Sequence, residues 1–431
     1  MNRTQLTLGA PLTAALLLGA SRAQAQDVKV NALVDVWYTQ ALDSNLRRNA
    51  VAPGKYYNLN SAFQENTFTL RRAEIYLAGK VSDELTYTVM FDPNIATTTA
   101  PNIVQDAFIT YKPTSWFSLQ AGQFKPLQTY EATLVASKDL YFYDRSQLGR
   151  VIGDKRDRGI VAGFGFGDAA SLAGKFSVGF ANGTTDKAGG KSADANAQKD
   201  FVSRLEFSYG KTQKFGIYGR SGSTDAKDAG SLNANPFAYA SQPAGPNDKT
   251  IPSTDQILQN KDKATNLGVY YALDTEQWIA QLEAVTGLLG RRFPSVGIAP
   301  PATGVSPAAR EWLDQRYLGY ALSGGYKFGS HALVARYDVF DYNRGNNYYG
   351  PFNPYTQNTT TGALTGADYS PKFREVVLGW NVTFTPGKWT LANFKLDYIH
   401  RSKNFLKANA ALGQTTEQGG DSLVAALQVA F

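Results

Sequence analysis

Apolar and polar residues alternate with a period of two along most of the chain. In the last ten residues, Leu423, Ala425, Leu427, Val429 and Phe431 share one parity, whereas the other parity carries Ser422 and Gln428. The alternation recurs in AEIYLAGKVS (73–82), DFVSRLEFSYG (200–210), RYLGYALSGGYKF (316–328) and EVVLGWNVTF (375–384). This period is typical of β-strands that bury or expose one apolar face, so the pattern predicts an all-β chain.

The alternating segments predict about sixteen strands, an even number. They are expected at 28–39, 67–81, 85–91, 103–112, 117–122, 158–167, 172–180, 201–209, 215–223, 264–273, 278–289, 317–328, 332–340, 373–385, 389–401 and 422–431.

The connections between these strands alternate in length. Short ones such as VSDELT (81–86) and TPGKW (385–389) alternate with long ones such as 41–66 and 224–263, which contain many Gly, Pro, Asn, Asp and Ser residues. Short periplasmic turns and long extracellular loops are typical of a transmembrane antiparallel β-barrel in an outer membrane. A soluble β-sandwich or propeller is the alternative, but it would need a very large core, and no blade-length repeat is visible. We therefore expect the membrane barrel.

The N-terminal segment 1–25 has the pattern of a secretory signal peptide. It combines Arg3, an apolar run from Leu6 to Gly19 and the small residues of Ala23-Gln24-Ala25. The run is too short to span a membrane as a helix. The alternative, a cytosolic N-terminal helix, would be interrupted by Pro11. We expect residues 26–431 to form one barrel domain, exported to the outer membrane.

Composition excludes several function classes. Removing the predicted signal peptide takes away Arg3 and Arg22 and no acidic residue, which lowers the formal net charge from +7 to +5. No helix-turn-helix or zinc-finger pattern accompanies this mild excess, so a nucleic-acid partner is not expected. The chain has no cysteine and only His331 and His400, neither in a catalytic motif. We expect neither an enzyme nor a cofactor or metal site.

The stretch GQFKPLQTYEATLVASKDLYFYDRS, residues 122–146, is the most distinctive in the chain. It resembles the phosphate-selective porin O and P family through Gly122, Gln123, Phe124, Lys125, Pro126, Ser137, Leu140, Phe142, Arg145 and Ser146. Clear motifs span Thr67 to Gly163, and beyond them the likeness consists of the strand pattern and the terminal Phe431.

This resemblance implies a sixteen-stranded barrel, usually trimeric, that conducts anions. We expect an outer-membrane porin for passive diffusion of small solutes, with a preference for anions and, as an open question, for phosphate or polyphosphate. The alternatives are a general-diffusion porin, a barrel enzyme and a structural outer-membrane protein. The expected partners are outer-membrane lipid, small anionic solutes, the barrel-assembly machinery and two further copies of the chain in a homotrimer.

The long segment 124–157 follows the fifth predicted strand and is the best candidate for a loop folded into the lumen. Its basic residues could form an anion constriction, together with the first one of the next strand; they are Lys125, Lys138, Arg145, Arg150, Arg156 and Arg158. Four acidic residues lie among them, namely Asp139, Asp144, Asp154 and Asp157. The alternative interpretation is therefore that these bases form internal ion pairs or solvated decoration.

A second basic set has the lumen parity of the strands. It consists of Lys80, Arg204, Arg220, Arg336 and Lys395, and acidic residues share the same face. A Lys or Arg facing lipid near the midplane would cost about 2–4 kcal/mol, which favours the lumen assignment. Of the adjacent Arg71 and Arg72, only Arg72 is expected to face the lumen, because successive strand residues point to opposite faces.

The C-terminal strand is expected to pair with the strand at 28–39, because an open edge in lipid would leave backbone groups without partners. Phe431 lies on the lipid-facing parity. A terminal aromatic residue after such a strand resembles the signal that the outer-membrane assembly machinery reads, so we expect Phe431 to serve in assembly.

Overall fold

A computed structural model describes residues 28–42, 66–95, 103–168, 170–183, 198–224, 262–294, 312–341, 344, 356–357, 364–365, 372–385, 389, 391–405 and 418–431. Within these residues the chain forms a closed antiparallel barrel of sixteen strands, as the sequence predicted. No helix in this part of the chain is long and apolar enough to cross a membrane. The predicted signal peptide at 1–25 lies outside the described residues and stays a prediction.

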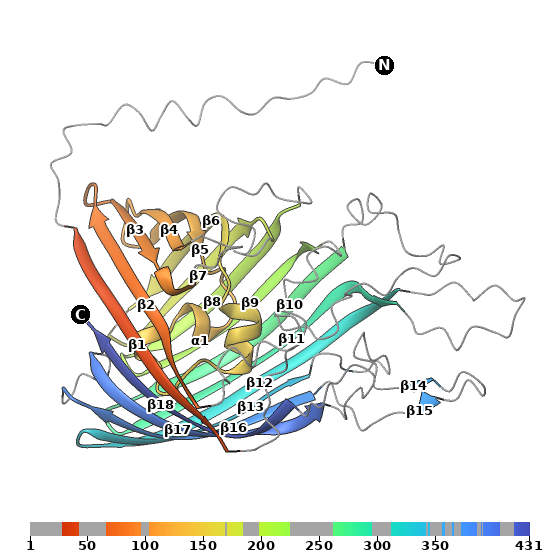
Figure 1. Cartoon of the computed structure of the whole chain (residues 1–431). Helices are drawn as coiled ribbons and strands as arrows, with labels where there is room; N and C mark the ends of the chain where they lie inside the picture. The colour runs from red at the N-terminus through yellow and green to blue at the C-terminus, as the bar shows by residue number, and fades with distance from the viewer. Residues whose placement is uncertain are drawn as a thin grey trace, which may run out of the picture.

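The barrel strands follow one another around the ring in chain order (Figure 1). They are β1 Lys29–Ala41, β2 Thr67–Lys80, β3 Leu85–Phe91, β4 Val104–Tyr111, β5 Phe117–Phe124, β6 Asp157–Gly167, β7 Leu172–Ala181, β8 Asp200–Tyr209, β9 Gln213–Thr224, β10 Asp262–Asp274, β11 Trp278–Pro294, β12 Trp312–Phe328, β13 His331–Asp341, β16 Lys372–Thr383, β17 Ala392–Phe405 and β18 Gln418–Ala430. A separate two-stranded sheet pairs β14 Thr356–Gln357 with β15 Leu364–Thr365.

The barrel closes where β1 pairs with β18. Beyond the last paired strand residue, the Phe431 N–H donates to the Ala32 carbonyl at 3.0 Å, and the Ala32 N–H donates to the Phe431 carbonyl at 2.7 Å. The Phe431 ring is 72% exposed on the outer face. Because lipid offers backbone groups no hydrogen-bond partner, these two bonds help to close the ring of strands.

The two faces of the wall differ in chemistry, as the alternation predicted. Leu322 and Leu378 are exposed on the outer face, whereas Arg336 and Glu375 are buried on the inner face. A charged side chain is far better solvated by a polar lumen than by hydrocarbon, so the period of two sorts apolar residues outward and charged ones inward.

A β-bulge in β2 changes this sorting at one point. The register with β1 shifts where Asp35 pairs with Arg72 and Val36 pairs with Leu70, which leaves Arg71 as the extra residue. Both arginines therefore turn to the inner side, and both reach Asp144. The prediction that only Arg72 faces the lumen was wrong, because a bulge inserts one residue and resets the parity of the strand.

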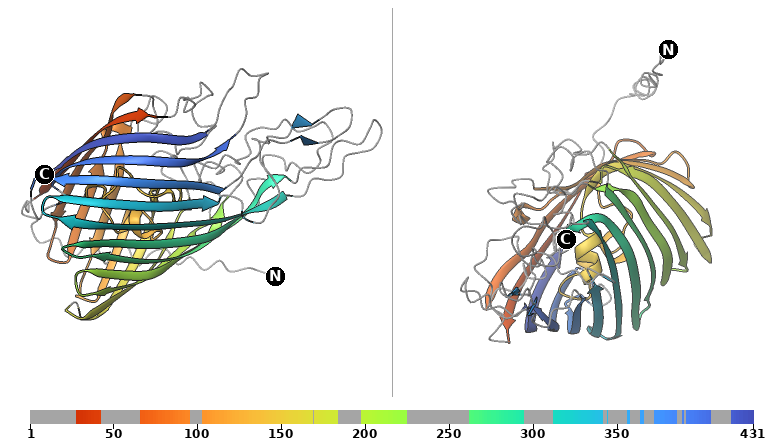
Figure 2. Two further views of the ribbon diagram at one scale, coloured as in Figure 1. Left: turned by 90° about the horizontal axis from the view of Figure 1, so that it is seen from below. Right: turned by 90° about the vertical axis from the view of Figure 1, so that its right-hand side faces the viewer.

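The segment between β5 and β6 folds back into the barrel (Figures 1 and 2). It contains the short helix α1 Tyr130–Thr133, the turn η3 Ser137–Asp139 and the π-helical turn η4 Gly149–Gly153. We call residues 125–156 the inner loop. Near its start, Gly122 has φ 137°, and a Cβ there would lie 2.2 Å from the Ala107 carbonyl oxygen, so only glycine fits this close approach.

The inner loop packs mainly against one side of the wall. Tyr130, Leu148, Val151 and Ile152 join a buried cluster with residues of β9–β13 and β16. Phe142 and Tyr143 join a second cluster with Trp37 and residues of β11, β13 and β16–β18. These apolar contacts press the loop onto the long strands and leave space beside β4–β8.

The closing bonds of Phe431 generate a prediction. Deleting Phe431 removes both hydrogen bonds to Ala32, whereas Phe431→Ala keeps them and removes only the ring. We expect both variants to lower the yield of assembled barrel, measured as heat-modifiable migration of outer-membrane protein on gels. Phe328→Ala, which removes another outward aromatic ring, is the control and should assemble normally. Normal assembly of Phe431→Ala would rule out the aromatic ring as the signal.

Candidate functional site

The inner loop is attached to the barrel wall by hydrogen bonds and ion pairs on several sides. The Tyr130 and Tyr143 N–H groups donate to Glu283 Oε1 at 2.7 Å and Asp397 Oδ2 at 2.5 Å. Gln147 Nε2 donates to Asp338 Oδ1, and the amide of Gln428 donates to the Lys138 carbonyl. Buried wall carboxylates and amides thus satisfy loop backbone groups that would otherwise lack partners.

Asp144 is the loop's main contact with β2. Its two carboxylate oxygens lie 2.9 Å from Arg71 Nη2 and 3.2 Å from Arg72 Nη2. Arg72 also contacts Asp35 at 3.2 Å, and the Arg71 guanidinium lies over the Trp37 ring. Burial alone would raise the pKa of Asp144, but the two arginines hold it well below its usual range. The carboxylate is therefore ionised at any physiological pH.

A second charge cluster joins the loop to β13, β16 and β17. Three guanidinium groups converge on Glu375: Arg401 at 2.8 Å, Arg336 at 3.0 Å and Arg150 at 3.1 Å. Arg336 also lies 3.0 Å from Asp338. Glu375 and Arg336 are fully buried, so removing their charges from water costs free energy. The close ion pairs have to offset that cost.

A third cluster lies at the root of the loop. Lys125 Nζ is 2.5 Å from Asp154, which also has Arg145 at 3.7 Å and Arg156 at 4.0 Å. Arg156 is shared with Asp106 on β4 at 3.1 Å. Burial and the neighbouring Arg145 charge lower the pKa of Lys125 to about 7, although Asp154 opposes this shift.

Most of the predicted constriction residues are placed in these clusters rather than in open space. Arg145, Arg150 and Arg156 are engaged in the ion pairs described above. Lys138 is half-exposed and lies 3.7 Å from Asp139. Arg158 shares the outer strand face with Ile160 and donates to Gln123 Oε1 at 3.4 Å, so it points away from the lumen.

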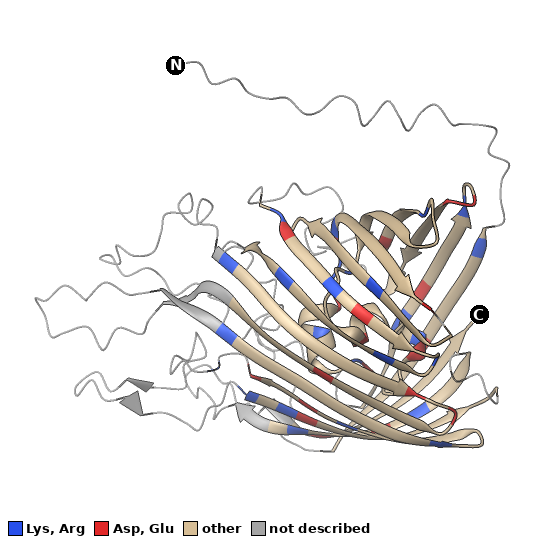
Figure 3. Ribbon diagram, turned by 180° about the vertical axis from the view of Figure 1, so that it is seen from behind, with Lys and Arg blue, Asp and Glu red and all other residues tan. Residues whose placement is uncertain are grey.

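The predicted wall residues also differ in their surroundings. Arg220 pairs with Asp200, and Lys395 donates to the Phe142 carbonyl and to Gln428 Oε1 at 3.4 Å. Arg204 pairs with Glu206 at 2.9 Å. Lys80 is exposed at the end of β2, lies 3.7 Å from Asp83 and lines neither of the two cavities described below. Basic and acidic positions are thus interspersed along the strands (Figure 3).

A cavity of about 520 Å³ lies between the inner loop and β4–β8. We call it the basic cavity, because Lys112, Lys125, Lys175 and Arg204 line it together with one acidic residue, Asp106. Asp106 is already paired with Arg156. Within the described part of the chain, Lys112 and Lys175 have no ion-pair partner, so the cavity carries uncompensated positive charge.

Sequence reasoning missed Lys112 and Lys175. Lys175 has the same parity as Ser177 and Ala181, which face inward on β7, so its position could have been derived from the alternation. Lys112 directly follows β4 in a short connection, where parity is no guide.

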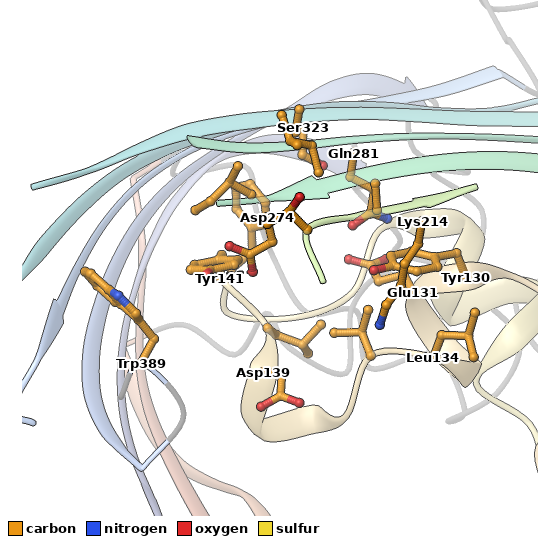
Figure 4. Close-up of a pocket in the computed structure, with 18 of the residues that line it drawn as sticks. Tyr130, Glu131, Leu134, Asp139, Tyr141, Lys214, Asp274, Gln281, Ser323 and Trp389 are labelled. Carbon is orange, nitrogen blue, oxygen red and sulfur yellow. Dashed lines mark hydrogen bonds between the residues drawn. The ribbon is translucent and has the colours of Figure 1, made fainter. Parts of the chain in front are cut away.

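A second cavity of about 410 Å³ lies between the loop and β9–β12, β16 and β17. We call it the aromatic cavity. It is lined by rings of the loop and of a short turn, by the lysines Lys211, Lys214 and Lys395, and by several amides. Trp389 lies at one end and Lys214 with Tyr130 at the other, with Tyr141 between them (Figure 4).

Both histidines face away from these cavities. His331 stacks with Trp380 and Phe328 on the outer wall. His400 alternates with the inward Ile399 and Arg401 and lies 2.6 Å from Asp421. Neither histidine is among the residues that line the two cavities.

Comparison with known proteins identifies the class of this barrel. Residues 52–372 match the family described as phosphate-selective porin O and P. The chain belongs to this family, and it is accordingly an outer-membrane channel protein.

Solved structures agree with the fold. The outer-membrane channel DcaP of Acinetobacter baumannii aligns with a TM-score of 0.52 and 10% identity, over 94% of this chain and 97% of that chain. A loop-deletion mutant of OmpT, an outer-membrane protein of Vibrio cholerae, aligns with a TM-score of 0.50 and 13% identity, over 95% of this chain and 100% of that chain. A comparison with curated protein sequences gave no match.

The contacts of Asp144 predict that its carboxylate holds the inner loop against β2. Asp144→Asn leaves Arg71 and Arg72 without their shared counter-charge, and breaking a buried ion pair typically costs about 3–5 kcal/mol. We expect a lower temperature for the heat-modifiable gel shift, and larger or noisier single-channel currents as the loop loosens. Asp139→Asn, which removes a half-exposed carboxylate of the same loop, is the control. Wild-type values for both measurements would show that Asp144 does not hold the loop.

The lowered pKa of Lys125 predicts a pH dependence. Lys125 is charged below about pH 7 and neutral above it, so its contribution to anion preference is lost as the pH rises. We expect reversal potentials in a salt gradient to shift toward cations between pH 6 and pH 8. Lys125→Arg keeps a charge throughout this range and should remove the shift. A shift that persists in Lys125→Arg would assign the titration to another group.

Proposed function

We propose that the protein forms a water-filled channel for passive diffusion that prefers small anions. The observation that carries this proposal is the basic cavity beside the inner loop. Its Lys112 and Lys175 have no ion-pair partner within the described residues, and its one acid, Asp106, is paired with Arg156. A general-diffusion porin without anion preference remains the alternative outcome of the test.

The electrostatics of the cavity favour anions for a simple reason. Walls of low dielectric constant focus the field of nearby charges into the aqueous space. Two unpaired ammonium groups there raise the local concentration of anions and lower that of cations. Mobile lysine side chains also bind weakly, which suits conduction, because a permeant ion has to leave again.

More specifically, we propose that phosphate is one of the anions that the basic cavity binds. The family description supports it, and a phosphate dianion would gain more than chloride from the positive charge of a cavity lined by both lysines. The buried arginines of the inner loop do not add to this argument, because their guanidinium groups are occupied by wall and loop carboxylates.

Neutralising the basic cavity tests the proposal. We expect the double variant Lys112→Gln/Lys175→Gln to shift the reversal potential in a KCl gradient toward cations, while single-channel conductance stays of the same order. Lys80→Gln removes a lysine charge from the end of β2, outside the cavity, and is the control. Unchanged selectivity in the double variant would leave a general-diffusion porin.

Added phosphate distinguishes a general preference for anions from specific binding of phosphate. Block of chloride current by millimolar phosphate, lost in the double variant, would support phosphate as a ligand. Absence of block with anion preference intact would support a channel for small anions in general.

We further propose that three copies of the chain assemble. A strand needs about 9–11 residues to cross the apolar layer of a membrane at a usual tilt. β3 has 7 residues, and β4 and β5 have 8 each, whereas β10 has 13 and β12 has 17. A short sector of wall is poorly matched to lipid, and the same sector of a second copy would cover it.

The molar mass of the detergent-solubilised protein tests this assembly. We expect light scattering to give three times the mass of the chain. A charge placed on the outer face of the short sector, Ile109→Lys, should produce monomers, whereas Leu378→Lys on the opposite wall should not. A monomeric wild type would contradict the proposal.

A further inference from the structure

The wall of the basic cavity carries a row of inward residues on four neighbouring strands. Ser118 on β5 pairs with Gly163 on β6. Gly163 pairs in turn with Ser177 on β7, which pairs with Arg204 on β8, and all four line the cavity. Side chains of directly paired residues stand about 5 Å apart on one face of a sheet. Gly163 therefore leaves one open place in an otherwise continuous strip of side chains.

Lys175 extends into this open place. Its backbone belongs to the next row, where it pairs with Gly165 on β6 and with Glu206 on β8. A Cβ built on Gly163 would lie 2.8 Å from Lys175 Cε and 3.6 Å from its Nζ. The lysine side chain therefore reaches from β7 over β6, and any side chain at position 163 would collide with it.

This direction keeps the lysine away from the acid of its own row. Glu206 lies on the β8 side of Lys175, and its Oε2 is 2.9 Å from Arg204 Nε. Lys175 is exposed to the cavity and has no ion-pair partner within the described residues. Because the side chain turns toward β6, its positive charge stays uncompensated.

Ser118 borders the same open place. Its Oγ would lie 2.7 Å from a Cβ at position 163, so the hydroxyl and the ammonium group both lie beside the space that the glycine leaves. Lys112 directly follows β4, the strand on the other side of β5, and lines the same cavity. Two lysines thus flank a hydroxyl that can donate a hydrogen bond to an anion.

We propose that Gly163 is a positioning residue for anions, because it seats Lys175 with its ammonium group beside the Ser118 hydroxyl. Lys112 completes this anion site from the other side of β5. The inference rests on the proposed preference for anions and names the residue that determines where the charge lies. Glycine supplies space and no counter-charge, so the ammonium group is placed without being neutralised. Such a site binds weakly, which suits a permeant anion.

Replacing Gly163 by alanine in the full-length protein tests the proposal. The end of a lysine side chain is flexible, so we expect Gly163→Ala to assemble normally, shown by heat-modifiable migration, while the ammonium group is displaced. The reversal potential in a KCl gradient should shift toward cations, by less than in Lys175→Gln, which removes the charge altogether. An unchanged reversal potential in Gly163→Ala, beside a shift in Lys175→Gln, would overturn this inference and leave the proposed function standing.

Gly165 offers a matched control on the same strand. It lines the same cavity two residues along β6, and a Cβ there would meet no atom closer than 3.8 Å. Gly165→Ala adds the same methyl group without contacting Lys175, so we expect wild-type selectivity. A shift as large as that of Gly163→Ala would assign the effect to the methyl group itself and overturn the seat.

Double variants identify the side chain through which the added methyl group acts. In a Lys175→Gln background, Gly163→Ala should have no further effect on the reversal potential, because the charge is already absent. In a Ser118→Ala background, the effect of Gly163→Ala should persist. The reverse pattern would show that the methyl group acts through the serine, and would contradict a role in placing the lysine.

Two comparisons separate this inference from the channel proposal. Anion preference that is lost in Lys112→Gln/Lys175→Gln but kept in Lys175→Gln alone would contradict the seated lysine and support the proposed function. A wild type without anion preference, unchanged by the double variant, would contradict the proposed function and the anion site together.

Discussion

The exclusion of charge from hydrocarbon governs this structure. Every charged wall residue near the midplane has to point into the barrel, so the outer face is reduced to apolar and aromatic side chains and the lumen collects both signs of charge. Where the folded loop buries some of these charges, they need partners, because an unpaired buried charge is costly. The inner loop supplies the missing partners: Asp144 for Arg71 and Arg72, and Arg150 for Glu375.

This arrangement separates two kinds of basic residue. Buried arginines hold the loop in place. Each is paired with a carboxylate at contact distance, so its guanidinium group is not free to bind a solute. Exposed lysines at the edges of the cavities, such as Lys175 and Lys214, remain open to solutes. Arginine suits the first task through its several fixed donors, and lysine suits the second as a mobile point charge.

The sequence was sufficient for the barrel and insufficient for the site. A period of two is enforced by lipid at each strand, so the strands were predicted within a few residues: 278–289 was expected where β11 is Trp278–Pro294, and 103–112 where β4 is Val104–Tyr111. The bulge at Arg71 was not predictable, because nothing in a single strand shows the register of its neighbour. Loop charges such as Arg145 could be identified but not assigned, because their partners lie far away in the chain and depend on how the loop folds.

The inner loop also acts as a cross-brace. Each strand of the ring is hydrogen-bonded only to its two neighbours, so the strands alone make no contact across the lumen. The loop is tied to β2 through Asp144, to β11 through Tyr130, and to β16 and β17 through Arg150 and Tyr143. The loop therefore joins parts of the wall that are up to seven strands apart around the ring, and we expect it to resist changes in the cross-section of the lumen when the membrane is compressed or thinned.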